Sequence, residues 1–416
     1  MKLFALFGVL ALAASASPAA ASPTFRSDGP NAEAYGAAEG YPVGRATVGR
    51  FPQHFMVGSF SHYDTLLRTR EVRRGGPVSE LRRAEPDLEL TYRHDGAPRT
   101  LADYVDRNPV TGLLIAKGDT ILFEHYQYGR TDRHRFVSQS MAKTVTAMLI
   151  GIALAEGKIA SIEDRVERYV PGLAGTEYGG TTLRSLLTMS SGVLFREDYD
   201  GADDMARLGR DLFGPESPGP VSAVRQFNTR AAPADSVFYY ASIETEILGL
   251  VLHAAVGTPV ADYLSSRIWQ PLGAEADAGW AIDRTEQEAT FCCLSAVLRD
   301  YARLGLMLAH DGAWNGRQIV PRDWVLEATT ASPERPHLRP GRATPRSFGY
   351  GYQVWLPPGP RRTFALLGIH GQSITVDPTS KLVMVQTAVR PMPANDPGAR
   401  EGRALWTALL EKLGSE

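Results

Sequence analysis

The sequence is poor in cysteine: its 416 residues contain two, and these are neighbours, Cys292 and Cys293. A disulfide between adjacent residues strains the peptide that joins them, so we expect two unbonded, small, buried apolar side chains. The same scarcity argues against a metal centre, because neither further thiolates nor a histidine pair at ligand spacing accompanies the two cysteines. The sequence therefore predicts neither a disulfide nor a bound metal.

The chain also lacks an excess of charge and, after its first residues, a long apolar run. A formal net charge of −2 offers no attraction for nucleic acid or an anionic membrane. The apolar run Leu3–Ala14 follows Lys2 and precedes Ala19-Ala20-Ala21, which predicts a cleavable secretory signal over residues 1–21. That run is too short to span a bilayer. We expect a periplasmic or secreted protein without a stable membrane anchor, and the oligomeric state stays open.

Lysine is scarce as well, since only six of the 44 basic residues are lysines, and one of these has an unusual setting. Lys143 is the only lysine with a serine, Ser140, three positions before it. Apolar residues recur at 141, 145, 148, 149 and 152, so the spacing predicts a buried helix over residues 140–156 that ends at Gly157. An N-cap serine followed by a solvated lysine is the alternative, but this helix is very apolar. We predict a nucleophile and its base, because burial disfavours the charged amine.

The rest of the chain indicates an α+β fold, an α/β sandwich with an added, mostly helical lobe. Residues 22–100 form an N-terminal arm and lead-in, and one domain covers residues 101–416. A hairpin at 111–128 and strands between 350 and 389 lie on either side of a helical block at about 161–330. We expect these strands to pair into one antiparallel sheet, flanked by the 140–156 helix and a last helix at 402–413. A cleft would lie between the sheet and the helical lobe.

Two further stretches are candidates for the same site. Tyr239-Tyr240-Ala241-Ser242 leads into a predicted helix, where a Tyr-x-Ser motif can direct a phenol and a hydroxyl at a nucleophile and its lysine. A buried aromatic pair with an N-cap serine is the alternative interpretation. The second stretch, residues 368–372, is a glycine-bearing strand whose backbone could approach a substrate. A β-bulge would explain it equally well, and His370 is either a substrate contact or an edge residue.

The order Ser-x-x-Lys, Tyr-x-Ser and then a glycine-bearing strand resembles the serine hydrolases of the β-lactamase and penicillin-binding-protein superfamily. The nearest resemblance is to the class C β-lactamase-related branch, which includes 6-aminohexanoate-dimer hydrolases and carboxylesterases. It extends from about Met56 to the C-terminus. The stretches that carry it are Gly112–Ile115, Ser138–Thr144, Leu186–Val193, Phe195–Tyr199, Arg299–Gly305 and Gly368–Gln372.

The resemblance implies a role for each matching residue. Ser140 would be acylated, Lys143 would be its base, and Tyr240 would carry a proton to the leaving group. The backbone N–H groups of Ser140 and Gln372 would form the oxyanion hole. The substrate-binding residues would be Tyr199, which matches a tyrosine that contacts the leaving amine, together with Ser242, Ile369, His370 and Gly371. The family implies a small ester or amide substrate and neither a metal nor an organic cofactor.

One departure from the family pattern concerns the substrate. β-Lactamases and transpeptidases usually carry Lys-Thr-Gly where this chain has Ile369-His370-Gly371. Loss of that cation removes a charge-assisted contact of about 1.5–3 kcal/mol with a substrate carboxylate. The sequence thus favours ester or amide hydrolysis over the alternatives, a β-lactamase or a D-alanyl-D-alanine carboxypeptidase. A non-catalytic protein that binds peptidoglycan on the same scaffold could lose the lysine or the tyrosine, whereas this chain keeps both.

Overall fold

The computed structural model describes residues 28–44, 51–342 and 348–415, and its main feature is an eight-stranded sheet. The strand order is β12-β13-β14-β15-β16-β5-β6-β2, with every neighbouring pair antiparallel except β2 and β6. The strands of this sheet are β2 (Arg82–Arg83), β5 (Val110–Lys117), β6 (Thr120–Tyr126), β12 (Gly349–Tyr350), β13 (Trp355–Leu356), β14 (Phe364–Gly368), β15 (Gln372–Asp377) and β16 (Leu382–Ala388).

At the centre of the sheet, a strand from the first third of the chain pairs with one from near its C-terminus, as the sequence predicts. β5 pairs with β16, placing Leu113 opposite Gln386, and β6 follows β5 through the turn at Gly118, which has a φ of 64°. β5 is apolar along nearly its whole length because both of its faces are covered. Leu113 and Leu114 point to opposite faces and lie in different hydrophobic clusters. The predicted pairing of the early hairpin with the late strands is confirmed.

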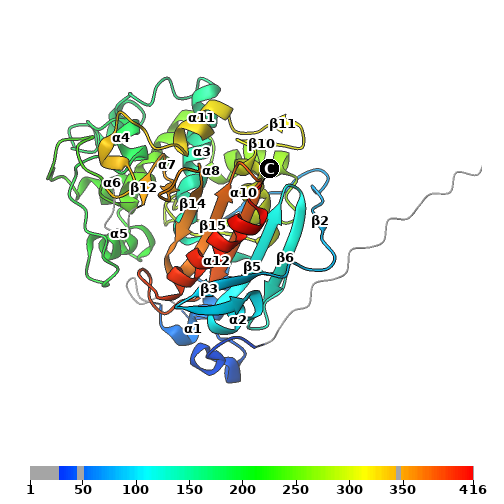
Figure 1. Ribbon diagram of the computed structural model, residues 1–416. Coiled ribbons are helices and arrows are strands. Elements are labelled where there is room, and N and C mark those ends of the chain that lie inside the picture. The colour runs from blue at the N-terminus through cyan, green and yellow to red at the C-terminus, as the bar shows by residue number, and fades with distance from the viewer. Residues whose placement is uncertain (1–27, 45–50, 343–347, 416) are drawn as a thin grey trace, which may run out of the picture.

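Each face of the sheet is covered by a helix, but one of the two is not the helix that we expected. α12 (Gly398–Leu413) covers one face, where Leu405 and Leu409 share a cluster with Leu113 (Figure 1). α10 (Leu298–Ala309) packs on the strands β5, β15 and β16. Gly305 makes this contact possible, since a Cβ there would lie 2.7 Å from Val383. The predicted 140–156 helix instead packs mainly on other helices, so that part of the expectation was wrong.

Helix α3 (Ala142–Ala155) contains the Ser-x-x-Lys lysine and packs against α7 (Ser242–Val256) and α11 (Arg322–Ala328). The other α-helices are α1 (Gln53–Ser61), α2 (Leu101–Arg107), α4 (Leu183–Leu187), α5 (Asp204–Phe213), α6 (Pro220–Arg225), α8 (Val260–Leu264) and α9 (Gln270–Leu272). A π-helical turn, η7 (Ser265–Trp269), joins α8 to α9. Short 3₁₀ turns are η1 (Ala32–Tyr35), η2 (Ala37–Glu39), η3 (Tyr63–Thr65), η4 (Gln139–Met141), η5 (Val166–Arg168), η6 (Pro171–Leu173), η8 (Pro336–Leu338) and η9 (Ile369–Gly371).

A second sheet brings segments that lie far apart in the sequence up to the start of α3. Its order is β1-β8-β9-β7, formed by β1 (Thr69–Val72), β8 (Ala278–Ala281), β9 (Leu294–Ala296) and β7 (Phe136–Val137). Ser295 lies in β9, which pairs with both β7 and β8, and α10 begins three residues later, at Leu298. Two hairpins complete the strands: β3 (Thr91–His94) with β4 (Ala97–Thr100), and β10 (Ala313–Trp314) with β11 (Arg317–Gln318).

The predicted signal at residues 1–21 lies outside the described residues, and the domain boundary at residue 101 stays a prediction. From residue 28 the arm contains η1 and η2, and Tyr35 is buried with its hydroxyl donating to the Val389 carbonyl at 2.7 Å. Among the described residues, no single helix is both long and apolar enough to cross a membrane. α7 and the helical segment after it would reach that length only as a pair bent by 75°.

Candidate active site

The predicted nucleophile lies in a tight turn between β7 and α3. Ser140 is the middle residue of η4, the 3₁₀ turn that leads directly into α3. The turn is held from outside, because the Ser138 N–H donates to the Leu294 carbonyl at 2.7 Å. Backbone N–H groups in the first turn of a helix have no partner within the helix. The Ser140 N–H is thus in a position where it can donate to an anion.

Lys143 lies against Ser140 and is fully buried. Its Nζ donates to Ser140 Oγ at 2.8 Å and to the Phe291 carbonyl at 2.9 Å, and the residue is 1% exposed. Burial lowers the pKa of Lys143 from its ordinary value of 10.5 to about 8, and the negative charge of Glu197 opposes that shift. A neutral amine is therefore accessible near physiological pH, which a base requires.

Of the two neighbouring tyrosines, Tyr239 and Tyr240, it is Tyr240 that faces this site. Lys143 Nζ lies 5.1 Å from the centre of the Tyr240 ring, and the ring stacks on Trp355 at 5.4 Å. Burial raises the pKa of Tyr240, as does the charge of Glu197, while a hydrogen bond with the Ser140 side chain opposes the rise. A protonated phenol beside a serine hydroxyl can pass a proton onward.

Replacement of Tyr240 by phenylalanine should lower kcat by roughly 10²–10⁴-fold, the usual cost of losing a proton-transfer group. The matched control is Tyr239→Phe, since the Tyr239 side chain is 46% exposed and its N–H donates to the Met189 carbonyl. Initial rates with a p-nitrophenyl ester measure both variants. A large loss in the Tyr239 variant with near-normal rates in the Tyr240 variant would contradict this assignment.

Glu197 connects the other predicted residues, although it was not among the site residues that we predicted. Its Oε1 accepts hydrogen bonds from the hydroxyls of Tyr199 and Ser242, both at 2.7 Å, and its Oε2 accepts from the Ser242 N–H at 2.6 Å. We expected the Ser242 hydroxyl to point at Lys143, but it donates to Glu197 instead. The negative charge of Glu197 also raises the pKa of Lys143 and that of Tyr240. The signal that could have revealed it was its place in the Glu-Asp-Tyr stretch.

The end of β14 lies against the nucleophile turn. A Cβ on Gly368 would lie 2.6 Å from the Ser138 carbonyl oxygen, so only glycine allows this approach. Gly368 pairs with Gln372, the first residue of β15. The Gln372 side chain is buried, with Nε2 donating to the Ala388 carbonyl at 2.7 Å and Oε1 accepting from the Ala388 N–H at 3.0 Å. An oxyanion hole built from the N–H groups of Ser140 and Gln372 stays a prediction.

The expectation that His370 could contact the substrate needs correction. The ring is 4% exposed and packs edge-on against Phe51 and Phe60, and its Nδ1 lies 2.7 Å from the Arg390 carbonyl oxygen. His370 has a φ of 62°, and this backbone turn directs the ring into the core. Burial lowers the pKa of His370, so the ring is neutral at pH 7.

The neighbours of His370 remain candidates for substrate contact. Ile369 is half-buried at the first position of η9, directly after β14, and its side chain brings no charge. Gly371 has a φ of 95°, and a Cβ there would meet the Arg390 side chain at 2.9 Å. This tight backbone turn fixes the direction in which the chain enters β15.

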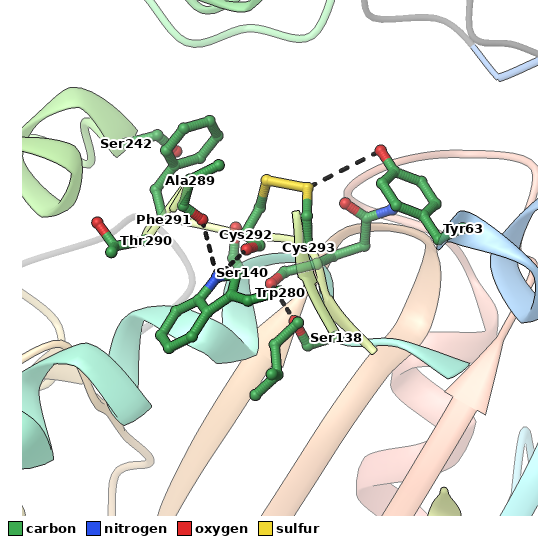
Figure 2. Close-up of a disulfide and its surroundings, with 12 residues drawn as sticks. Tyr63, Ser138, Ser140, Ser242, Trp280, Ala289, Thr290, Phe291, Cys292 and Cys293 are labelled. Carbon is green, nitrogen blue, oxygen red and sulfur yellow. Dashed lines mark hydrogen bonds between the residues drawn. A yellow bond between two sulfur atoms is a disulfide. The ribbon is translucent and has the colours of Figure 1, made fainter. Parts of the chain in front are cut away.

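The two cysteines are bonded, which contradicts our expectation. Cys292 and Cys293 form a disulfide between adjacent residues (Figure 2). They are buried, at 8% and 3% exposure, as predicted. Cys293 has a φ of 68° and lies in the left-handed region, a backbone conformation that its residue type does not predict. Among the described residues, no group of three or more His, Cys, Asp or Glu side chains is placed to hold a metal ion.

Comparison with known proteins identifies the family of this chain. The family model described as Beta-lactamase matches residues 97–405. The 6-aminohexanoate-dimer hydrolase of Paenarthrobacter ureafaciens is 27% identical over 357 residues, covering 85% of this chain and 89% of that protein. A solved structure from Bacillus anthracis, named for the same activity, aligns with a TM-score of 0.78 and 25% identity over 88% of this chain and 97% of the other. A family VIII carboxylesterase aligns with a TM-score of 0.56 and 18% identity, covering 73% and 93%.

The match covers well over half of the chain, and its fold and the Ser-x-x-Lys pair agree with it. The chain therefore belongs to the Beta-lactamase family. Within that family it is a serine hydrolase, and it is similar to a 6-aminohexanoate-dimer hydrolase over most of its length. Its likeness to the family VIII carboxylesterase is one of fold. The family resemblance inferred from the motifs is confirmed.

Proposed function

We propose that this protein hydrolyses small ester or amide substrates through an acyl-enzyme on Ser140. The observation that carries the proposal is the 2.8 Å contact between Lys143 Nζ and Ser140 Oγ, together with the complete burial of the lysine. A buried amine with a pKa of about 8 can accept a proton from a serine hydroxyl as that hydroxyl attacks. Similarity to an amide hydrolase and to a carboxylesterase supports the same reaction class.

The reaction would proceed in two stages. Lys143 takes the Ser140 proton while Oγ adds to the substrate carbonyl carbon. The backbone N–H groups of Ser140 and Gln372 hold the resulting oxyanion. Tyr240 delivers a proton to the departing alcohol or amine, and water then attacks the acyl group with the same residues assisting. Glu197 supports these steps by fixing Tyr199 and Ser242 beside the site and by placing a negative charge near Lys143.

The substrate class follows from the strand end that borders the site. A β-lactam carries a carboxylate next to its reacting amide, and recognition of that group favours a fixed cation. Ile369 is apolar, and the His370 ring is buried and neutral at pH 7. These positions offer no such cation, which favours uncharged esters and linear amides.

We expect a short-chain p-nitrophenyl ester to have a higher kcat/KM than a chromogenic cephalosporin. Both substrates would use Ser140, so the ratio of the two constants reports recognition alone. An Ile369→Lys variant supplies the matched comparison, and its ratio should move toward the cephalosporin. Ser140→Ala must remove both activities if one site is responsible. Efficient cephalosporin turnover with poor ester turnover by the natural protein would overturn the ester and amide assignment in favour of a β-lactamase.

Export to the periplasm or the medium is part of the proposal. The predicted signal at residues 1–21 is one reason. The Cys292–Cys293 bond is a second and independent reason, because disulfides persist mainly in oxidising compartments. Fractionation of cells that produce the full-length chain, with N-terminal sequencing of the mature protein, tests this. Retention of the uncleaved chain in the cytoplasm would contradict it.

A further inference from the structure

The segment around the disulfide contacts both members of the Ser140–Lys143 pair. On its N-terminal side, the Phe291 carbonyl accepts the hydrogen bond from Lys143 Nζ at 2.9 Å. On its C-terminal side, the Leu294 carbonyl accepts the hydrogen bond from the Ser138 N–H at 2.7 Å. The two cysteines are the only residues between these carbonyls, and Figure 2 shows the disulfide beside Ser140 and Phe291. The bond thus lies between the contact that holds the base and the contact that holds the nucleophile turn.

Both ends of this segment are fixed to neighbouring elements. The Thr290 hydroxyl donates to the Thr245 carbonyl of α7 at 2.9 Å, and the Thr290 carbonyl accepts from the Thr146 hydroxyl of α3 at 2.9 Å. Leu294 begins β9 and pairs with Trp280 of β8. Between these two ends, the backbone conformation of residues 291–293 determines where the Phe291 carbonyl points.

The backbone of this short stretch is in a disfavoured conformation. Cys293 has a φ of 68°, and a Cβ makes the left-handed region unfavourable for any residue other than glycine. The sulfur–sulfur bond closes a small ring with the peptide that joins the two cysteines, which removes most alternative backbone conformations. Three hydrogen bonds also support the turn. The Cys292 N–H donates to the Ala289 carbonyl at 3.1 Å, and the Cys292 carbonyl accepts from Trp280 Nε1 at 2.9 Å. The Cys293 carbonyl accepts from the Ala281 N–H at 3.2 Å.

We propose that the Cys292–Cys293 disulfide is a positioning element for catalysis: it keeps the Phe291 carbonyl against Lys143, and its reduction slows the acylation of Ser140. This inference rests on the proposed function. In reduction by a dithiol such as dithiothreitol, the sulfur–sulfur bond breaks, two electrons and two protons give two cysteine thiols, and the dithiol becomes a cyclic disulfide. Cys293 is then free to return to a negative φ, and the Phe291 carbonyl turns away from Lys143 Nζ.

The experiment measures the rate of Ser140 labelling by a fluorophosphonate, together with kcat and KM for a short-chain ester. It compares the oxidised protein, the protein reduced with dithiothreitol and then desalted without air, and two double variants. In Cys292→Ala/Cys293→Ala and in the reduced protein, acylation should fall roughly 10–100-fold with little change in KM, as expected for a misplaced base. Cys292→Ala/Cys293→Gly should stay close to the oxidised protein, because glycine accepts the left-handed backbone.

The controls separate this inference from the proposed function. Dithiothreitol must leave both double variants unchanged, and alkylation of the denatured protein should find no thiol before reduction and two after it. Thiols present before reduction would overturn the inference, and so would equal acylation rates in the oxidised, reduced and Ala/Ala proteins. Failure of the oxidised protein to be labelled on Ser140 would instead reject the proposed function. If the Ala/Ala variant does not fold, the reduced protein and the Ala/Gly variant give the answer.

Discussion

Replacement of Ser140 by alanine is expected to reduce kcat for a p-nitrophenyl ester by about 10⁶-fold, the scale seen when a serine hydrolase loses its nucleophile. The physical reason is that no other group takes the position 2.8 Å from Lys143 Nζ. Stability should change little, since the Ser140 side chain makes no cap on η4 or α3, and Lys143 keeps its bond to the Phe291 carbonyl. Rates of p-nitrophenol release measure kcat, and thermal unfolding measures the stability.

Ser138→Ala is the matched control for this substitution. It removes a hydroxyl two residues away, one that donates to the Gln139 carbonyl at 2.9 Å, and it should leave most of the activity in place. Mass spectrometry after fluorophosphonate treatment should locate the adduct on Ser140. An adduct on Ser138, Ser190 or Ser191 would show that the nucleophile is misassigned, and an unlabelled protein would favour a non-catalytic binding role.

Replacement of Lys143 by arginine should lower the acylation rate by roughly 10⁴-fold, the upper end of what a general base contributes. A guanidinium stays protonated at any working pH, so it can hold a charge at this position without accepting the serine proton. Lys143→Met is the companion variant, because it removes the base without burying a charge. If the Arg variant kept most of its activity, Lys143 would serve only to position the serine.

The pH dependence of the natural protein tests the same assignment. Because the reactive form of Lys143 is the neutral amine and its pKa is about 8, kcat/KM should rise with pH and level off above pH 8. Glu197 raises this pKa, so Glu197→Gln should move the rise to lower pH. A flat profile between pH 6 and 9 would contradict the role of Lys143.

Local sequence patterns predicted most of the architecture. Helix α3 could be recognised because the apolar residues that bury it recur with its own period, within a few residues of one another. The hairpin of β5 and β6 could be recognised because Gly118 marks the turn between two apolar strands. We did not predict that α10, rather than the 140–156 helix, covers one face of the main sheet. A helix's own sequence does not specify which sheet or helix it will pack against.

The site was predicted less completely, for a related reason. Ser140 and Lys143 lie one helical turn apart, so their contact follows from helix geometry alone. Glu197 reaches Ser242 across 45 positions of chain, and the Phe291 carbonyl reaches Lys143 across 148. Such contacts depend on the path of the whole chain. Short-range spacing carries no information about them.

The α+β fold class, the family and the Ser-x-x-Lys helix could be predicted from the residue pattern, because each depends on motifs of neighbouring residues. The hydrogen bond from Ser242 to Glu197, the burial of the His370 ring and the bond between Cys292 and Cys293 became visible in the folded chain alone. In each case a backbone turn or a distant partner sets the direction of a side chain. The left-handed conformations of His370 and Cys293 are held by surroundings that their own residue types do not specify.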